Sequence, residues 1–520
     1  MNSLYDAYLE GRPEVRNNFD KQPESLFSIR TDDSAWAPGA VQAVNELQGA
    51  LGGCKGDLSG LEPVVVTGQQ PGLFTGPLYT ILKAVSAIQI ARRLGSPDRS
   101  VIPLFWNASD DHDLVEVQTA HFLGLGEKVV SYTYTPDCNE VPHKDVSMFR
   151  VPLSPVLHHY IESAAAACRN SGNAAEVRDF LHDSLNQSQS VSAWFSRLMA
   201  GLFRNTPLRI FEPHRESARR ASLPVLRREI QCPLESTRLL VESGKQLAAL
   251  GFDVPIKKDA ASCNFFVEED GRRRKVLYSN GRYILHGVER IWSVDEMLAL
   301  LESEPWRFSP NVALRPVVQQ LLFGPVAYVA GPGELAYWSQ LKPLFSFFDL
   351  SMPIVYPRVR AMCVTGKLRK FLNEYHLDIP AVARNKDVLF HALKGTDGTL
   401  LIDTFRQQRP DIEGALESMA ASLRNASSAP GLGKAVASFL AHSHFRLERL
   451  ERAVFYADEE SRRRVEGHLE RLRNAFYPLG KPQERVFNVF SFLFREGFGL
   501  IDRMLNELDC TKSDPQEMDL

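Results

Sequence analysis

Up to about residue 360, short β-branched runs alternate with stretches whose apolar residues recur every three or four positions. This alternation is typical of an α/β fold. The first clear case is an apolar run at Val64–Val66, followed by an amphipathic segment over 78–94. Pro77 suits the first helical position of that segment and Gly95 a stop, and Val101–Trp106 is a second expected strand. The pattern predicts a βαβ unit with parallel strands, because such crossovers are right-handed.

Two further strands are expected later in the chain. Val326–Ala330 precedes Gly331-Pro332-Gly333-Glu334 and a helical stretch, and Met352–Tyr356 ends at Pro357-Arg358. If all four strands are parallel, the loops after them meet at the carboxyl edge of one sheet, where open α/β sheets bind ligands. We therefore predict a Rossmann-like parallel-sheet core over residues 61–360 with a ligand site at that edge.

Three segments are expected to add to this core. Residues 1–60 predict an N-terminal helical segment that packs on it, and about 120–250 predict a helical insertion. Residues 262–288 predict a β-meander, because Asp270-Gly271 and Asn280-Gly281 are typical hairpin turns. We interpret the basic run Arg272–Lys275 as a solvated edge that blocks strand pairing, with phosphate binding as the weaker alternative.

Residues 361–510 are nearly all helical in pattern. A heptad-like seam is formed by Leu440, Leu447, Leu450, Val454, Val465, Leu469, Leu472 and Phe476. With charged residues between these positions, the seam predicts a coiled coil or a long helical hairpin. We favour dimerisation through it over an amphipathic helix packed on its own domain, so a homodimer is expected. Residues 511–520 are expected to be a frayed tail.

Composition narrows the class of protein. A chain of 520 residues exceeds what one hydrophobic core usually supports, so two or more domains are expected. A net charge of -3 gives no basic field to attract nucleic acid or an anionic membrane. There is no apolar run of the roughly 18 residues that a membrane span needs and no signal-like start, so we expect a cytoplasmic protein. The seven scattered cysteines favour reduced, mostly buried thiols over disulfides or a zinc cluster.

The loop after the first strand is rich in glycine. Gly68, Gly72 and Gly76 recur at intervals of four before a helix, where backbone amides can approach an anion. The spacing matches neither the dinucleotide nor the P-loop fingerprint, so anion binding and a purely structural turn remain equal alternatives. The loop also carries the polar residues Gln69, Gln70, Thr75 and Tyr79. Lys83 on the following helix is interpreted as a surface lysine.

The loop after the second strand holds the densest ionisable cluster of the chain. It is Asp110-Asp111-His112-Asp113, with Glu116 one turn further on. Carboxylates beside an imidazole can orient or deprotonate an amine or bind a cation. The alternative is an acidic helix N-terminus favoured by the helix dipole. We favour a functional cluster because it shares the sheet edge with the glycine loop; a metal site with His121 fits no standard zinc spacing, so no metal ligand is predicted.

A third group of polar residues surrounds the later strands. It comprises Arg315, Gln319, Gln320, Gly331, Gly333, Glu334, Tyr337, Gln340 and Arg358. The two arginines suit a carboxylate or phosphate, or ordinary salt bridges. Glu334 is also well placed to cap the helix that begins beside it.

Four segments, taken together and in order, resemble a known family. They are TGQQPGLFTGPLYTILKAVSAI, FWNASDDHDLVEV, LRPVVQQLLFGPVAYVAGPGELAYWSQLKPLF with MPIVYPR, and FYPLGKPQERVFN. They resemble the bacillithiol biosynthesis cysteine-adding enzymes, a family of cysteine ligases. The resemblance implies a Rossmann-like core with connecting-peptide insertions, distantly similar to class I aminoacyl-tRNA synthetases, and a coiled-coil domain that dimerises.

The same resemblance implies a reaction. The carboxyl group of L-cysteine would be joined to the amine of glucosaminyl-malate, with ATP and Mg²⁺ as expected co-substrates because amide formation in water needs an activated carboxylate. The chain departs from the family pattern in two places. It has SDDHD at 109–113 where the family usually has SEDHD or TEDHD, and the amide Gln320 where the family has a carboxylate. The HIGH and KMSKS signatures are absent.

The resemblance also implies residue roles. The 67–79 loop would cradle phosphate or cysteine, the acidic cluster would hold or deprotonate the amine, and Arg315 and Arg358 would bind malate carboxylates or phosphates. The predicted catalytic residues are Asp111, His112 and Asp113. The predicted substrate-binding residues are Thr67, Gln69, Gln70, Thr75, Gly76, Tyr79, Asp110, Arg315, Gly331, Gly333, Glu334, Tyr337, Gln340 and Arg358, and the predicted nucleotide contacts are Gly68, Gly72 and Gly76.

Two other functions stay open on the sequence alone. One is a nucleotide-binding scaffold protein whose coiled coil recruits partners and whose sheet-edge site is vestigial. The other is a metal-dependent hydrolase that uses the Asp110–Asp113 cluster.

Overall fold

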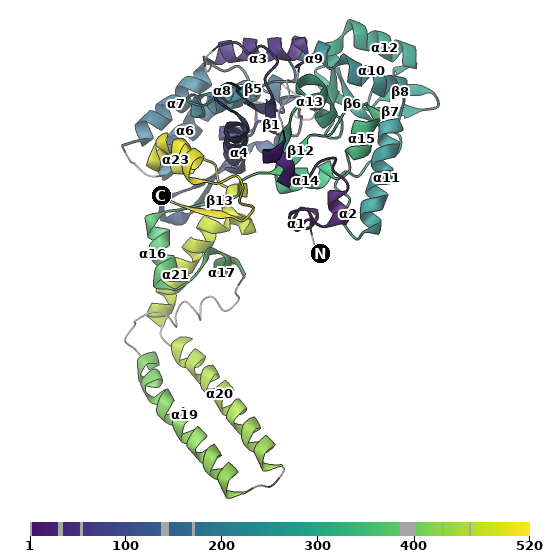
Figure 1. The fold of residues 1–520 in the computed structure, drawn as a ribbon. Helices are drawn as coiled ribbons and strands as arrows, with labels where there is room; N and C mark the ends of the chain where they lie inside the picture. The colour runs from purple at the N-terminus through teal and green to yellow at the C-terminus, as the bar shows by residue number, and fades with distance from the viewer. Residues whose placement is uncertain are drawn as a thin grey trace. The chain divides into compact units, whose positions relative to one another are not determined.

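The structure is a computed structural model that describes residues 3–29, 35–52, 56–136, 145–168, 172–384, 401–427, 429, 431–456 and 459–520. The chain forms two compact units (Figure 1). Unit 1 comprises Met1–Leu125, Val129–Cys363 and Gln483–Met518, and unit 2 comprises Gly126–Lys128, Val364–Pro482 and Asp519–Leu520. The segment 361–510, expected to be one domain, is thus divided between the units, because the chain returns to unit 1 at Gln483.

The core of unit 1 is a five-stranded parallel sheet in the order β12-β11-β1-β2-β5. Its strands are β1 Val64–Gln69, β2 Ile102–Asn107, β5 Arg209–Phe211, β11 Ala327–Ala330 and β12 Ile354–Pro357. The four predicted strands are confirmed. The fifth, β5, was missed because three residues are too few to show a period, and it lies inside the segment expected to be a helical insertion.

The strand order places a switch point beside β1. From β1 the chain moves outward to β2 and β5, and it then returns to the other side of β1, where Val65 pairs with Ala327 of β11. Because the crossovers on the two sides of β1 run in opposite directions, a crevice opens at the carboxyl ends of β1 and β11.

The helix after β1 begins later than the sequence predicted. Helix α4 spans Tyr79–Leu94, and residues Thr80 to Ala91 are all buried. Before it the chain makes a short 3-10 turn, η2 Leu73–Thr75, and the N–H of Leu78 donates to the carbonyl of Phe487 (2.7 Å). Pro77 therefore precedes the helix instead of opening it.

The N-terminal segment and a long insertion supply many further helices and short strands of unit 1. The N-terminal segment forms α1 Leu4–Leu9, α2 Pro13–Arg16, η1 Pro23–Ser28 and α3 Pro38–Leu51. The insertion between β2 and the second sheet carries α5 Leu114–Val117, β3 Thr119–Leu123, η3 Leu125–Glu127, β4 Val129–Thr133, η4 Met148–Arg150, α6 Val156–Cys168, α7 Ala174–Asn186, α8 Val191–Leu202, α9 Glu216–Ala221, α10 Leu223–Gln231 and α11 Glu235–Ala249. The insertion is largely helical, as expected, but includes the β3-β4 hairpin.

The predicted β-meander is confirmed and is part of a larger antiparallel sheet. Its strands are β6 Ser262–Glu269, β7 Arg272–Ser279 and β8 Arg282–Leu285, and β9 Ile291–Trp292 and β10 Phe308–Pro310 complete the order β10-β6-β7-β8-β9. Both predicted turns have positive φ, from 51 to 75°, as such two-residue turns require. Strand β7 lies between β6 and β8, so the interpretation of its basic run as a sheet edge was wrong.

The remaining helices and 3-10 turns of unit 1 come from the later part of the chain. They are α12 Val294–Ser303, η5 Pro305–Arg307, α13 Arg315–Phe323, α14 Pro332–Trp338, α15 Lys342–Phe347, η7 Gln483–Arg485, α22 Phe490–Glu496 and α23 Gly499–Glu507. The C-terminal residues do not fray as expected: β14 Gln516–Asp519 pairs with β13 Ala361–Val364. Met518 in β14 is buried, and this anchors the tail.

Unit 2 is helical. Its elements are α16 Gly366–Glu374, α17 Ile379–Arg384, α19 Leu401–Ala426, α20 Leu432–Tyr456, α21 Glu459–Phe476 and η6 Pro478–Gly480. Helices α19 and α20 run side by side as a long hairpin (Figure 1). The second half of the predicted seam, from Val465 to Phe476, is buried, whereas Leu450 in the first half stays 50% exposed.

Candidate active site

Two adjoining pockets open at the carboxyl edge of the parallel sheet. Pocket 1 has a volume of about 230 Å³ and is lined by Gly68, Gln69, Gln70, Trp106, Ala108, Asp110, Asp111, Pro213, Arg273, Pro310, Asn311, Val312, Arg315 and Glu334. Pocket 2 has a volume of about 430 Å³ and is lined by Gln69, Tyr79, Lys83, Glu116, Gly331, Pro332, Gly333, Glu334, Tyr337, Arg358 and Arg485. The pockets share Gln69 at the end of β1 and Glu334 after β11, so they meet at the switch point of the sheet.

The glycine loop is held tightly by the protein itself. A Cβ on Gly68 would lie 2.7 Å from the carbonyl oxygen of Trp106, and one on Gly72 would lie 2.8 Å from the Cα of Gly76. Gly68 lines pocket 1, but neither Gly72 nor Gly76 lines either pocket. Of the two alternatives for these two glycines, the structure therefore supports the structural turn.

A segment from the far end of the chain clamps this loop. Phe74 and Thr75 have φ values of 53° and 74°, a conformation that side chains rarely adopt. The Nδ2 of buried Asn488 donates to the carbonyls of Phe74 and Gly76, the latter at 2.8 Å. The predicted motif FYPLGKPQERVFN thus helps to shape the loop, and Thr75, which is fully buried, lies outside both pockets.

Lys83 is a central residue of the site, and its interpretation as a surface lysine was wrong. Its side chain is only 2% exposed and forms an ion pair with Glu334. Its Nζ also donates to the carbonyl of Gly68 (2.6 Å) and to Oε1 of Gln69 (2.9 Å). Burial lowers the pKa of Lys83, and the charge of Glu334 opposes this effect. Lys83 therefore ties the end of β1 to the loop after β11.

Glu334 links the two pockets through a chain of hydrogen bonds. Its carboxylate accepts from the N–H of Gly331 (2.8 Å), as a capping residue does, and from the hydroxyl of Tyr328 (2.7 Å). Burial alone would raise the pKa of Glu334, but the Lys83 ammonium holds it below its usual value. On the pocket 1 side, Arg315 donates to the hydroxyl of Tyr337 (3.0 Å). The carboxylate is thus engaged by three groups of the protein and serves to position its neighbours.

Asp111 faces pocket 1 as an ionised carboxylate. Its Oδ1 accepts from the N–H groups of His112 (2.7 Å) and Asp113 (3.2 Å), and its Oδ2 accepts from Gln70 (2.8 Å). Burial would raise the pKa of Asp111, but the charge of Arg273 and these hydrogen bonds bring it below its usual value. A carboxylate with a lowered pKa is a weak base, so it is better suited to hold an ammonium group than to deprotonate one.

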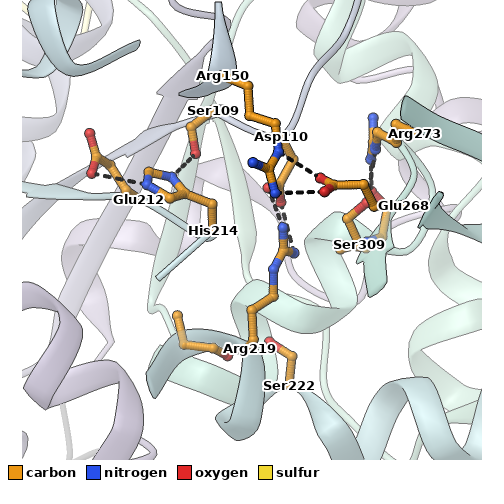
Figure 2. Close-up of polar contacts among 12 residues, drawn as sticks. Ser109, Asp110, Arg150, Glu212, His214, Arg219, Ser222, Glu268, Arg273 and Ser309 are labelled. Atoms are coloured by element: carbon orange, nitrogen blue, oxygen red, sulfur yellow. Dashed lines mark hydrogen bonds and ion pairs between the residues drawn. The ribbon is translucent and has the colours of Figure 1, made fainter. Parts of the chain in front are cut away.

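The other two acids of the cluster are already engaged. Asp110 is buried and forms a two-point ion pair with Arg219, with one N–O distance of 3.0 Å (Figure 2). Asp113 is exposed and accepts from the N–H of Glu116 (3.3 Å) as the N-cap of α5. Among the described residues no group of three or more acidic, histidine or cysteine side chains is arranged to hold a metal ion.

His112 packs against the second sheet and holds Arg273. The Nη1 of Arg273 lies 3.2 Å from Nδ1 of His112, and the ring stands edge-on to Phe266 with centroids 5.3 Å apart. An arginine can only donate, so Nδ1 is the acceptor and the neutral ring carries its proton on Nε2. Burial, and then the charge of Arg273, lower the pKa of His112. His112 does not line pocket 1, and this geometry makes it a positioning residue for Arg273.

Arg273 is the main pocket residue that sequence analysis missed. It is buried, its Nε donates to Ser309 (2.8 Å), its Nη2 donates to the carbonyl of Pro310 (2.6 Å), and its guanidinium lies 4.0 Å from the centroid of the Phe266 ring. Burial lowers its pKa to about 10, so it remains charged at neutral pH. In a run of four cations no local signal separates the buried one from the solvated ones.

A second polar group includes Ser109 of the acidic loop together with His214 and Glu212 (Figure 2). The Oγ of Ser109 is 2.8 Å from Nδ1 of His214, and Nε2 of His214 is 3.8 Å from Glu212. The His214 ring stacks on Phe149 with centroids 4.4 Å apart, and burial lowers its pKa. Ser109 is fully buried, so this group supports the loop instead of presenting a nucleophile. His214 and Glu212 follow strand β5 directly, so this polar group could not be predicted without that strand.

Three predicted residues make strong contacts within the protein. Arg358 borders pocket 2, but its guanidinium forms a two-point ion pair with Glu484 (2.7 and 2.9 Å). Gln340 is fully buried, lines neither pocket, and accepts from the N–H of Ile256 (2.6 Å). Thr67 is fully buried and donates to the carbonyl of Val329 (3.0 Å) across the sheet. The other predicted residues, Gln69, Gln70, Tyr79, Asp110, Asp111, Arg315, Gly331, Gly333, Glu334 and Tyr337, all line one or both pockets.

A Rossmann-like α/β unit with a charged pocket at its switch point and a helical-hairpin unit define the class of this protein. Comparison with family models gives the particular family. Residues 2–359 match the N-terminal Rossmann-like domain of bacillithiol biosynthesis BshC, and residues 361–515 match its C-terminal coiled-coil domain. The chain belongs to the BshC family of bacillithiol biosynthesis, a family of ligases that form a carbon–nitrogen bond.

Curated relatives agree with this assignment. The chain is 31% identical to "Putative cysteine ligase BshC" of Geobacillus kaustophilus over 85% of this chain and 81% of the relative. It is 30% identical to the protein of the same name from Koribacter versatilis, over 90% and 86%, and 29% identical to that of Salinibacter ruber, over 85% and 80%. Neither the scaffold nor the hydrolase alternative is favoured by these relatives.

Solved structures add no argument, since the similarity to Thermus thermophilus arginyl-tRNA synthetase has 13% identity and a TM-score of 0.21, covering 96% of this chain and 91% of that one. In the described part of the chain, no helix has the length and apolarity to cross a bilayer.

Proposed function

We propose that this protein joins the carboxyl group of L-cysteine to the amine of glucosaminyl-malate in an ATP-dependent reaction. The amine nitrogen bonds to the carboxyl carbon and loses a proton, and one carboxyl oxygen leaves with the activating group from ATP. The proposal rests on family membership, on the names of the relatives, and on the charges of pocket 1.

The observation that carries the proposal is that an ionised carboxylate and guanidinium groups line one cavity. Asp111 faces pocket 1 together with Arg315, and no ion pair within 4.0 Å joins either of them to a described residue. An amine donor that also carries carboxylates suits such an arrangement, because the acid orients the amine and the arginine pairs with an anion. In this role Asp111 holds the amine, as its lowered pKa favours.

Pocket 2 has features that suit the phosphates of ATP. It is lined by Lys83, Arg358 and Arg485, and the Nε of Arg358 is buried with no hydrogen-bond partner among the described residues. A Cβ on Gly331 would lie 3.6 Å from that Nε, so the bare glycine leaves space beside a donor. Arg485 and Arg358 would hold phosphate oxygens there, and Mg²⁺ would be bound through the nucleotide. ATP supplies the activation that an amide bond in water needs.

The test is a reconstitution with purified protein. L-cysteine, glucosaminyl-malate, ATP and magnesium are mixed, and bacillithiol, AMP and ADP are followed by mass spectrometry. Bacillithiol with AMP indicates adenylation of cysteine, and product with ADP indicates phosphorylation. The Asp111→Asn variant should lose most of the turnover, while Asp113→Asn, which changes the exposed neighbouring acid, serves as the matched control. Absence of product with all components present would refute the proposal.

We also propose self-association through the α19-α20 hairpin. Ile412, Met419, Leu423, Phe439, Phe445 and Leu450 on these helices are 42 to 63% exposed. Large exposed apolar side chains along a hairpin favour burial against a second copy. Light scattering should give the mass of a homodimer, and a Phe445→Glu variant should shift the mass to that of a monomer.

A further inference from the structure

The charges that line pocket 1 do not balance. Two of its three carboxylates are compensated, since Asp110 pairs with Arg219 and Glu334 with Lys83. Asp111 has no cation within 4.0 Å in the described ranges, and neither Arg273 nor Arg315 has a carboxylate that close. The pocket therefore presents two guanidinium groups and one carboxylate that lack an ion-pair partner. A buried charge without a partner is costly, so a ligand of complementary charge should be bound there.

Both arginines are held in place with donors to spare. Three of the five N–H groups of Arg273 go to Ser309, Pro310 and His112. Arg315 donates one N–H to Tyr337 (3.0 Å). No nitrogen of Arg315 is buried without a partner, so its remaining N–H groups reach open space, and Arg273 lines pocket 1 with two N–H groups beyond those three. A fixed guanidinium with free donors suits a carboxylate, because two parallel hydrogen bonds can form.

We infer that pocket 1 takes the amine substrate, a ligand with one primary amine and two carboxylates, and that Arg273 determines specificity for the second carboxylate. Arg315 pairs with one carboxylate, Arg273 with the other, and Asp111 with the amine. This assignment rests on the proposed ligation. Arg358, predicted from the sequence for this role, is held by Glu484 instead.

An α-amino acid such as cysteine fits the same pocket less well. It has one carboxylate and one ammonium group, so it would leave one of the two guanidinium groups without a partner. The cysteine therefore belongs on the pocket 2 side of Gln69 and Glu334, where the two pockets meet. The amine held by Asp111 and the cysteine carboxyl would then approach each other across these shared residues.

The test is a binding cycle measured without cysteine or ATP. Isothermal titration compares glucosaminyl-malate with the matching lactate glycoside, which lacks one carboxylate, in the wild type and in Arg273→Met. In the wild type, removal of that carboxylate should weaken binding at least about tenfold. In Arg273→Met the two ligands should bind within about twofold of each other. Equal discrimination by the two proteins would overturn the role of Arg273. If glucosaminyl-malate does not bind even at about 10 mM, which is above the usual range of substrate affinities, the subsite itself is overturned.

Controls separate this inference from folding defects and from the ligation itself. Arg272→Met changes a cation on the same strand that does not line pocket 1, and it should keep the discrimination of the wild type. If Arg273→Met does not fold, Arg273→Lys takes its place and should lose most of the discrimination, because an ammonium group cannot form the two-point pair. If Arg273→Met removes the discrimination but the wild type forms no amide product, the subsite stands and the proposed ligation is refuted. If the wild type forms amide product but Arg273→Met keeps the discrimination, the ligation stands and the role of Arg273 is refuted.

Discussion

Replacing Lys83 by methionine should destabilise unit 1 as strongly as a large cavity in a core would. Lys83 is 2% exposed, and Glu334, its partner, is 17% exposed. Methionine fills a similar volume, so the substitution leaves little void and mainly removes the charge. Loss of one partner from a buried ion pair typically costs about 3–5 kcal/mol, since the other charge remains buried alone. The variant also loses the donor to Gly68 and Gln69.

The double variant separates the pair from the individual groups. Glu334→Gln leaves the Lys83 ammonium buried without its counter-ion, so it should also lose about 3–5 kcal/mol. Lys83→Met with Glu334→Gln removes both charges together, and its loss should be smaller than the sum of the single losses by about 2 kcal/mol or more. Lys342→Met is the matched control, because Lys342 is 39% exposed and lies 3.5 Å from Asp20. A surface pair of this kind is worth less than about 1 kcal/mol.

Urea denaturation followed by tryptophan fluorescence is a suitable assay. All six tryptophans of the chain lie in unit 1, so the signal reports on the unit that contains the pair. The reasoning would be refuted if the losses in unfolding free energy of the two single variants add up to that of the double variant. It would also be refuted if Lys83→Met loses no more unfolding free energy than Lys342→Met.

The pH dependence gives a further check on the same pair. The folded-state pKa of Glu334 lies below its usual value. A carboxyl group of this kind contributes stability above its unfolded pKa of about 4.3, and the contribution is lost as the pH falls through the folded value. The difference in unfolding free energy between the wild type and Glu334→Gln should therefore be constant near pH 7 and become smaller below about pH 4.

Three other predictions concern the surroundings of the pockets. His112→Ala should lower turnover by about 100-fold, because Arg273 loses the acceptor that positions it; steady-state kinetics test this, and unchanged turnover would remove His112 from the mechanism. At pH 7 the His112 ring should be neutral with its proton on Nε2, since its pKa is lowered; a nitrogen–proton correlation spectrum assigned with His112→Gln shows the tautomer, and a charged ring would contradict the structure. Asn488→Ala should cost about 2 kcal/mol in urea denaturation, because buried carbonyls of the glycine loop lose their donor, whereas a loss under about 0.5 kcal/mol would mean that other contacts hold the loop.

The sequence predicts the main features of the fold because they repeat a simple pattern. The βαβ unit, the strands near 327 and 354 and the two meander turns all follow from periodicity and turn residues. Features set by long-range packing do not. The strand β5 is too short to show a period, and the pairing of β14 depends on a partner more than 150 positions away in the chain.

The candidate site follows the same division. Asp111, Arg315 and Glu334 stand next to predicted strands or motifs, so their place at the sheet edge could be predicted from the sequence. Lys83 and Arg273 could not, because burial decides their roles and a lysine on a helix or an arginine in a basic run looks the same whether it is solvated or buried. The environment of each is built from segments distant in sequence, such as Glu334 for Lys83.

The contact between Asn488 and the glycine loop has a consequence for the synthesis of the protein. The amide of Asn488 and the carbonyl of Gly76 are 412 positions apart along the chain. The loop therefore emerges from the ribosome well before its clamp is synthesised. A product that ends before residue 488 would contain every residue of pocket 1 and yet lack the clamp on the loop beside it. Such a product would hold the loop less firmly, so we expect pocket 1 to take its final shape only after residue 488 has been synthesised.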